Sequence, residues 1–371
     1  MHDDQLREEF TTWAQRLQAA RPPALPVLRR RARRRTARRG VAFSALAVLG
    51  VAAVIAVSGH PRAGRAHSVT PTVHGVPRYA VVLQHGGQDA AVLDMATGKV
   101  LGRVTMPGAR ADFEWVAAAA DDRTFVLAGQ AHALGVRFSV LHLGASGKPG
   151  RLAWLNVPPL RDAQVYGMAL TADASKLAVA WQNYPTGPVI SRISVTTLAT
   201  GATRTWSSAH GSAGAVSWAG DRTLAFTWQD VDHQAQSGVR LLGTGTPGTS
   251  LLASRLLVPA SARAPLLSSP GNPLITQDGS AVFATMADGA RTAIVRFSGR
   301  TGEFQEVLVP PIRSGPDPGY CGVLWTDPHG QHLLTQCGPI QASIEGNQST
   351  PIHLHQFIPA SPAGFANTFA W

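Results

Sequence analysis

Short apolar stretches separated by polar turns recur from Arg78 to the end of the chain. In each unit an apolar strand ends near an aromatic residue, and a polar turn and a second apolar strand follow. A hairpin centred on Thr-Gly or Ser-Gly comes later in the unit. The turn centres lie about fifty residues apart, near Asp121, Asp173, Asp221, Asp278 and His329. Four short strands per unit at this period predict the blades of a β-propeller.

The two ends of this repetitive region complement each other. The first unit, residues 78–104, lacks a first strand, whereas the chain ends in FANTFAW (365–371), which has the form of an unpaired first strand. Pairing the two would close the ring and remove two exposed sheet edges. The sequence therefore predicts an all-β fold, a six-bladed β-propeller. Its first blade would combine residues 78–105 and 365–371, and the other five would be 112–157, 165–207, 214–258, 272–310 and 320–358. A seventh blade would have to lie within residues 240–270.

The first 77 residues follow other patterns. Residues 2–20 predict a short amphipathic helix, because apolar residues recur there at helical spacing: Leu6, Phe10, Trp13 and Leu17. Residues 41–57 carry no charge, and about 17–20 apolar residues suffice for a helix to cross a bilayer. The polar segment 59–77, with its Pro and Gly residues, predicts a flexible stalk.

Positive charge concentrates beside the apolar run. Residues 1–40 hold eleven Arg against four acidic residues, and so carry +7 of the formal net charge of +11. Arginines at one end of a membrane span keep that end in the cytoplasm. We therefore predict a single-pass cell-membrane protein with a cytoplasmic tail (1–40), a transmembrane helix (41–58), the stalk (59–77) and an extracytoplasmic propeller (78–371).

A cleaved signal peptide is the alternative, although its positive region would be unusually long. In either case the Arg-rich run serves mainly as a topology signal with some affinity for anionic lipid. Nucleic acid is not expected as a partner.

The two cysteines of the chain, Cys321 and Cys337, both belong to the predicted extracytoplasmic part. They flank the turn at residues 327–330, so they would lie opposite each other on neighbouring strands, within reach of a disulfide. An oxidising compartment permits this bond. We predict the disulfide, and two free buried thiols are the alternative.

Polar residues cluster in the loops that lead into each first strand, which would line one mouth of the central channel. These candidate ligand-binding residues are Asp112, Glu114, Asp162, His210, Asn272, Asp317 and Tyr320. The loops between second and third strands add Asn183, Tyr184, Asp230, Asp232 and His233. Such a mouth could hold a cation or a sugar. The alternative is that these side chains cap turns and contact water.

The sequence contains no nucleophile elbow, zinc-binding His-Glu-x-x-His helix, phosphate-binding loop or Cys-x-x-Cys motif. We therefore assign no catalytic, cofactor-binding or metal-ligating residue and expect no enzyme activity. Several tryptophans sit at equivalent blade positions, which favours packing between blades over a carbohydrate-binding face: Trp115, Trp218, Trp325 and Trp371.

The turn Asp94–Gly98 has the form D-x-x-T-G, and related turns recur through residues 78–371. In these features the chain resembles the bacterial propellers grouped as TolB-like or YVTN/WD40-like, and especially single-pass, Arg-rich-tailed propeller proteins of high-GC bacteria. The Gly-His and Trp-Asp signatures of true WD40 repeats are absent from the repeats. The resemblance implies an architecture, and this architecture hosts many unrelated functions.

We expect the propeller to bind an extracytoplasmic protein or a small ligand and to signal to the cytoplasmic tail, for which a cytosolic protein would be the partner. A metal-dependent enzyme, like lactonases or sugar dehydrogenases, is the second hypothesis. Some relatives are encoded beside sigma factors, which implies a third, a membrane-bound regulator of a cytosolic sigma factor. A zinc-type anti-sigma domain would need His and Cys ligands in residues 1–40, where only His2 occurs.

Overall fold

The computed structural model describes most of the repetitive region. The described residues are 77–83, 88–95, 97–106, 111–131, 135–183, 189–230, 232–245, 248–262, 268–287, 291–313, 321–330, 332–337, 340–345, 348–351 and 368–370. The predicted amphipathic helix (2–20), the transmembrane helix (41–58) and the stalk up to residue 76 lie outside them. Within the described ranges, no helix is both long enough and apolar enough to span a bilayer.

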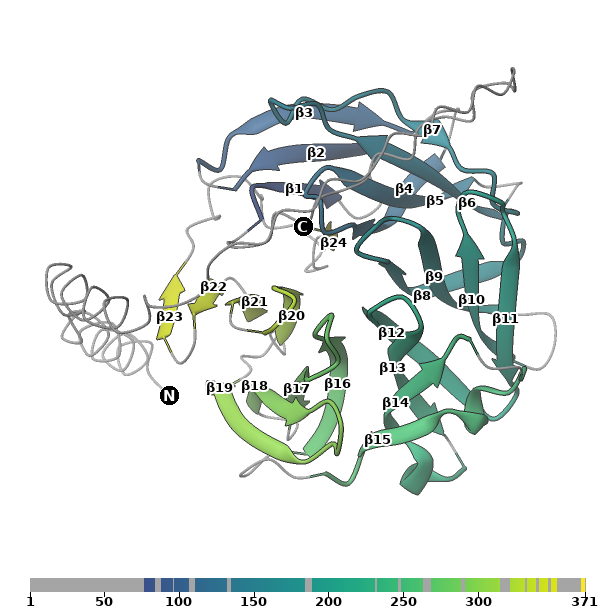
Figure 1. Cartoon of the computed structure of the whole chain (residues 1–371), viewed down its shortest axis with the longest axis vertical. Coiled ribbons are helices and arrows are strands. Elements are labelled where there is room, and N and C mark those ends of the chain that lie inside the picture. Colours follow the sequence, from purple (N-terminus) through teal and green to yellow (C-terminus); the bar gives the residue numbers. More distant parts are fainter. Residues whose placement is uncertain are drawn as a thin grey trace, which may run out of the picture. The chain divides into compact units, whose positions relative to one another are not determined.

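The described strands pair into six four-stranded antiparallel sheets (Figure 1). The first sheet joins both ends of the repetitive region, in the order β24 (Thr368–Ala370), β1 (Tyr79–Leu83), β2 (Asp89–Asp94) and β3 (Val100–Thr105). The second contains β4 (Ala111–Ala118), β5 (Thr124–Ala131), β6 (Gly135–His142) and β7 (Ala153–Trp154). The third contains β8 (Ala163–Leu170), β9 (Lys176–Asn183), β10 (Ser191–Thr197) and β11 (Thr203–Ser208).

The fourth sheet carries two short 3₁₀ helices in its connections, η1 (Gln234–Gln236) and η2 (Leu251–Ala253). Its strands are β12 (Gly211–Ala219), β13 (Thr223–Asp230), β14 (Gly238–Gly243) and β15 (Arg255–Pro259). The fifth contains β16 (Ser268–Ile275), β17 (Ala281–Ala287), β18 (Arg291–Ser298) and β19 (Phe304–Arg313). The sixth contains β20 (Cys321–Thr326), β21 (His332–Cys337), β22 (Ile340–Glu345) and β23 (Gln348–Pro351). The described strand residues within 240–270 thus belong to the fourth and fifth sheets.

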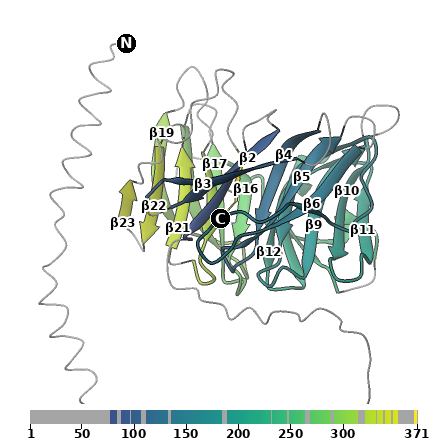
Figure 2. The same ribbon diagram turned by 90° about the horizontal axis from the view of Figure 1, so that it is seen from above.

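The first strand of each sheet lies at the centre of the ring and the last at its rim (Figure 1). Figure 2 shows the same sheets from the side. Each innermost strand contacts the next, in the cyclic order β24, β4, β8, β12, β16, β20 and back to β24. The predicted pairing of the C-terminal strand with the first unit is confirmed, because Val82 of β1 lies opposite Phe369 of β24. The fold is therefore an all-β propeller, as the repeats predict.

The Thr-Gly and Ser-Gly hairpins join the two outer strands of a sheet. Their glycines have positive φ, for example 67° at Gly98, 71° at Gly201 and 76° at Gly302. Glycine adopts this conformation without a steric penalty, which is why it marks these turns in the sequence. Before Gly98, the Asp94 carboxylate accepts hydrogen bonds from the backbone N–H and the hydroxyl of Thr97, both at 3.0 Å, and fixes the turn.

Hydrophobic cores fill the spaces between neighbouring sheets. Between the third and fourth sheets, Trp206, Trp218 and Trp228 pack in one buried cluster. The indole N–H of Trp218 donates to the backbone carbonyl of Ala169 in the adjacent sheet at 3.2 Å. Trp115 likewise packs against the core between the second and third sheets. The predicted packing of tryptophans between blades is thus confirmed for Trp115 and Trp218.

The register of β20 and β21 sets Cys321 directly opposite Cys337. The predicted backbone arrangement of the two cysteines is therefore present. Their side chains lie outside the described ones, so the disulfide itself remains a prediction.

Candidate ligand-binding mouth

One end of the ring carries the connections into the first strands and those between second and third strands. Asp112 is the second residue of β4, Asp162 directly precedes β8, and His210 directly precedes β12. Because the first strands are equivalent in successive sheets, these three candidates lie at the same end of their sheets. Asp317, Tyr320 and Tyr184 fall outside the described residues.

The surroundings of these candidates differ. Asp112 is partly buried within β4, whereas Asp162 is exposed and has a φ of 46°. His210 is exposed, and its backbone N–H donates to the Ser208 hydroxyl at 3.3 Å. In the part of the chain that the structure describes, no three His, Cys, Asp or Glu side chains are grouped so that they could hold a metal ion.

Glu114 and Asn272 lie in irregular stretches of two innermost strands. The pairing of β4 with β5 skips Glu114, and the pairing of β16 with β17 skips Asn272. Glu114 is partly exposed, while the side chain of Asn272 is outside the described ones. Both residues therefore lie in the wall of the ring, within strands, and not in the loops where the sequence analysis placed them.

The described residues of the connection between β13 and β14 form several hydrogen bonds with one another. The buried Asp230 carboxylate accepts the backbone N–H groups of Asp232 and His233, at 3.0 and 2.7 Å. Its backbone N–H donates to the hydroxyl of Ser237 at 2.8 Å. These contacts close the loop on itself and leave Asp232 and His233 exposed at its surface.

Asp230 is held in its charged form by this arrangement. Burial raises the pKa of its carboxyl, but the backbone N–H groups of His233 and Asp232 outweigh burial and lower the pKa below the ordinary value. The Nδ1 atom of His233 lies 3.5 Å from the carboxylate and adds to the effect. Asp230 thus caps a turn, and Asp232 and His233 face solvent, which is the arrangement that the alternative describes.

A buried arginine fixes the other side of the same loop. Arg240 of β14 is 6% exposed. Its guanidinium donates to the Gln236 carbonyl at 3.0 Å, the Leu252 carbonyl at 3.1 Å and the Ser254 hydroxyl at 2.9 Å. A fixed planar fork of donors suits such a set of oxygens. Arg240 therefore ties the β13–β14 connection to the η2 segment.

A further polar network, which the sequence analysis missed, lies between the third and fourth sheets at this end. Gln182 donates to the hydroxyls of Ser191 and Ser212, at 3.2 and 2.7 Å, and Ser191 accepts the backbone N–H of Ala213 at 2.8 Å. Gln182 and Ser191 are buried. The sequence does show polar residues within otherwise apolar strands at these positions. That pattern alone does not reveal which residues they bind.

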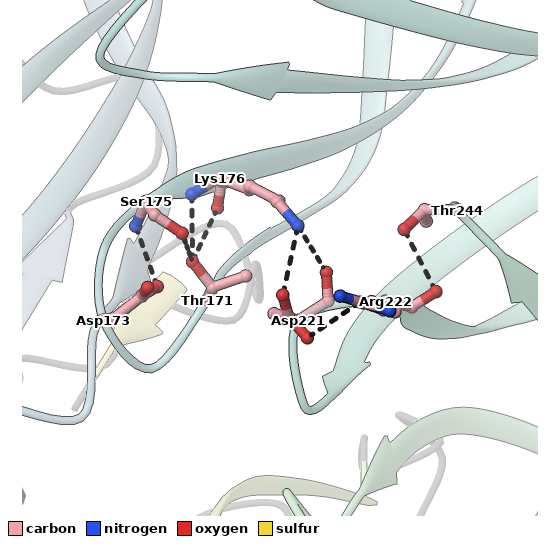
Figure 3. Close-up of polar contacts among 7 residues, drawn as sticks. All are labelled: Thr171, Asp173, Ser175, Lys176, Asp221, Arg222 and Thr244. Atoms are coloured by element: carbon pink, nitrogen blue, oxygen red, sulfur yellow. Dashed lines mark hydrogen bonds and ion pairs between the residues drawn. The ribbon is translucent and has the colours of Figure 1, made fainter.

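The opposite end of the ring carries the hairpins between first and second strands. Lys176 reaches from the third sheet to the fourth, where its ammonium donates to the Asp221 carbonyl at 2.7 Å and lies 3.4 Å from the Asp221 carboxylate (Figure 3). Within the same hairpin the Thr171 hydroxyl accepts the backbone N–H of Lys176 and the Asp173 carboxylate accepts that of Ser175 (Figure 3). The contacts of Lys176 with Asp221 bind neighbouring sheets together, and the other two fix the hairpin that carries Lys176.

Asp278 likewise connects two neighbouring sheets, the fifth and the sixth. Its carboxylate accepts the Thr276 hydroxyl at 2.7 Å and the Ser280 backbone N–H at 2.9 Å, and lies 3.2 Å from Nδ1 of His329. Partial burial raises the pKa of Asp278, but these hydrogen bonds lower it well below its usual range. The turn-centre residues of the repeats are thus structural at this end.

The cyclic arrangement of four-stranded antiparallel sheets defines the chain as a β-propeller protein. No protein-family model and no curated protein matches its sequence. Its structure is similar to TolB from Acinetobacter baumannii, with 13% identity and a TM-score of 0.49 over 79% of this chain and 66% of the TolB chain. It is also similar to a protein of unknown function from Bacteroides caccae, with 9% identity and a TM-score of 0.45 over 79% of this chain and 98% of that one. At such identities the similarity concerns the fold alone.

Proposed function

We propose that this chain is a single-pass membrane protein whose six-bladed propeller, closed by the C-terminal strand, is a binding module outside the cytoplasmic membrane. In this proposal the mouth formed by the loops into the first strands and between second and third strands receives an extracytoplasmic protein or small ligand. Because the anchor would connect the propeller to the cytoplasmic tail, binding at the mouth would send a signal to that tail.

The observation that carries the proposal is the set of hydrogen bonds within the β13–β14 connection. Asp230 accepts the backbone N–H of His233 and Arg240 donates to the backbone carbonyl of Gln236, so two buried side chains hold this connection, while Asp232 and His233 stay exposed. Buried charges are costly unless they are fully hydrogen-bonded, and here they stabilise the shape of a surface loop. A loop fixed before binding loses little entropy when a partner docks, which is the property of a recognition surface.

The membrane part of the proposal rests on the uncharged run 41–57 and the arginines before it. Replacing Leu49, at the middle of this run, by Arg should release the chain from membranes, because a charge at the bilayer centre is unfavourable by about 2.5–3.5 kcal/mol. Carbonate extraction of membranes from cells that express either form measures this. Equal retention of both forms would contradict the anchor.

Site-specific photocrosslinking in intact cells tests the binding role. A photoreactive residue in place of Asp232 should give a discrete crosslinked product, because this position lies on the fixed loop. The same residue in place of Arg222, which is exposed at the opposite end of the ring, is the matched control. Absence of a product at Asp232, or the same product from both positions, would contradict a partner at the mouth.

A further inference from the structure

A β-bulge recurs at the centre of the propeller. Five innermost strands, β4, β8, β12, β16 and β20, interrupt their pairing with the second strand of the sheet. The pairings of second with third strands in the same five sheets are continuous. A bulge removes its extra residue from the ladder and redirects the side chain, and such features are frequent beside binding sites. Interrupted pairing is therefore common to the innermost strands of these five sheets, although the outermost pairings of the fourth and fifth sheets are irregular as well.

The skipped residues in the second, third and fourth sheets are Glu114, Tyr166 and the pair Gly214–Ala215. Each is partly exposed, although the residues just before them, Phe113, Val165 and Ala213, are buried. Neighbouring sheets cover both faces of these strands, so the remaining exposure opens toward the axis of the ring.

These bulges also lie at one level along the axis. A Cβ atom on Gly167, which follows Tyr166, would come within 2.9 Å of the Ala215 Cα and 3.0 Å of the Val216 nitrogen. The bulge of β12 therefore packs directly against that of β8, and only glycine fits between them. Strand β4, with Glu114, contacts β8 on its other side.

The three bulges supply complementary hydrogen-bonding groups. Glu114 offers a carboxylate, and Tyr166 a hydroxyl, which donates to the Gln164 side-chain carbonyl at 3.1 Å. Gly214 and Ala215 are partly exposed, and the pairing of β12 with β13 skips them, so their backbone groups lie outside the regular ladder. A sugar hydroxyl both donates and accepts, so this mixture of acceptors and donors around one axis suits several hydroxyls at once, and the tyrosine ring adds an apolar face.

We propose that Glu114, Tyr166 and the Gly214–Ala215 backbone form an axial site for a small neutral polyol of the monosaccharide type. The inference rests on the proposed binding function and names the class of ligand and the residues that would recognise it. Glu114 accepts hydroxyl hydrogens, Tyr166 orients the ring, and the bulge of β12 closes the side of the site.

Saturation-transfer NMR on the full-length chain, in micelles of a detergent without a sugar headgroup, tests this site. The probes are D-glucose, D-galactose, D-mannose and N-acetyl-D-glucosamine. At least one should receive saturation from the protein. For that sugar, Glu114→Gln should weaken binding about tenfold and Tyr166→Phe about fivefold, as expected for loss of a charged and a neutral hydrogen bond.

The matched control is Glu303→Gln, which alters an exposed carboxylate at a hairpin of the fifth sheet and should leave binding unchanged. Unchanged melting temperatures would show that both axial variants are folded. Absence of transfer to all four sugars, or wild-type affinity in both folded axial variants, would overturn the axial site. A persisting crosslink at Asp232 in that case would leave the mouth and the general binding function intact, so the two failures are distinguishable.

Discussion

At the scale of single residues, backbone conformation separates equivalent positions of the repeats. Ala174 and Gly279 both follow the turn-centre aspartate of a first hairpin and have positive φ, 57° and 69°. A residue with a Cβ atom is disfavoured there by about 1–2 kcal/mol, whereas glycine is not. The third sheet therefore contains a strained turn that the fifth sheet avoids.

Ala174→Gly should raise the free energy of unfolding by about 0.5–1 kcal/mol, because relief of this strain exceeds the added entropy of an unfolded glycine. The converse change Gly279→Ala should lower it by about 1 kcal/mol. Denaturant titration followed by tryptophan fluorescence measures both. A loss of stability in Ala174→Gly would show that the turn is not strained.

Asp278 should make stability depend on acid pH. Its pKa in the folded protein lies below the ordinary value of 3.8, so the folded state favours the carboxylate. The stabilisation is therefore complete above that ordinary value and decreases as pH falls toward the folded pKa. Asp278→Asn should melt at a lower temperature than wild type at neutral pH, and this difference should shrink below about pH 4.

Circular dichroism melts over a pH series measure this difference. Asp162→Asn, which alters an exposed aspartate at the other end of the ring, is the control and should show no such convergence. A constant difference between Asp278→Asn and wild type at every pH would rule out the ionised Asp278 as its source.

At the scale of elements, the β20–β21 hairpin brings the two cysteines into register. A disulfide here would close a short loop and contribute about 3 kcal/mol by the chain-entropy estimate. We expect the exported chain to resist alkylation until it is reduced, which intact-mass spectrometry detects. The double variant Cys321→Ser with Cys337→Ser should unfold at lower denaturant concentration. Alkylation of both thiols without reductant would refute the bond.

At the scale of the whole molecule, ring closure depends on a short strand. Among the described residues, β24 pairs with β1 over three residue pairs, and it also contacts β4 and β20. Deletion of residues 365–371 should expose the edge of β1 and lower both the midpoint and the steepness of denaturant unfolding, since less surface would unfold in one step. Addition of the free 365–371 peptide should recover part of the midpoint, whereas a scrambled peptide should not. Unfolding identical to that of the full chain would mean that β24 contributes nothing to closure.

The sequence by itself determined the strand repeats, the positions of their turns and the partner of the C-terminal strand. These follow from the alternation of apolar residues and from glycine at positive φ. Both are local requirements, so they are visible in the residue types at single positions. The opposition of Cys321 and Cys337 was predictable for the same reason, because hairpin register follows from the turn between two strands.

Only the tertiary structure decided which polar residues act together. Asp230, singled out as a mouth residue, is buried as a loop cap, whereas the sequence analysis did not single out the buried Arg240 and Gln182. The bulges at Glu114 and Tyr166 were likewise hidden, because a single extra residue hardly disturbs an apolar pattern yet redirects a side chain. The contacts of Gln182 with Ser212 and of Ser191 with Ala213 join two sheets, so only the packing of these sheets brings the residues together. The contacts of Asp230 are local, but the polar pattern of the sequence does not show that its side chain is buried.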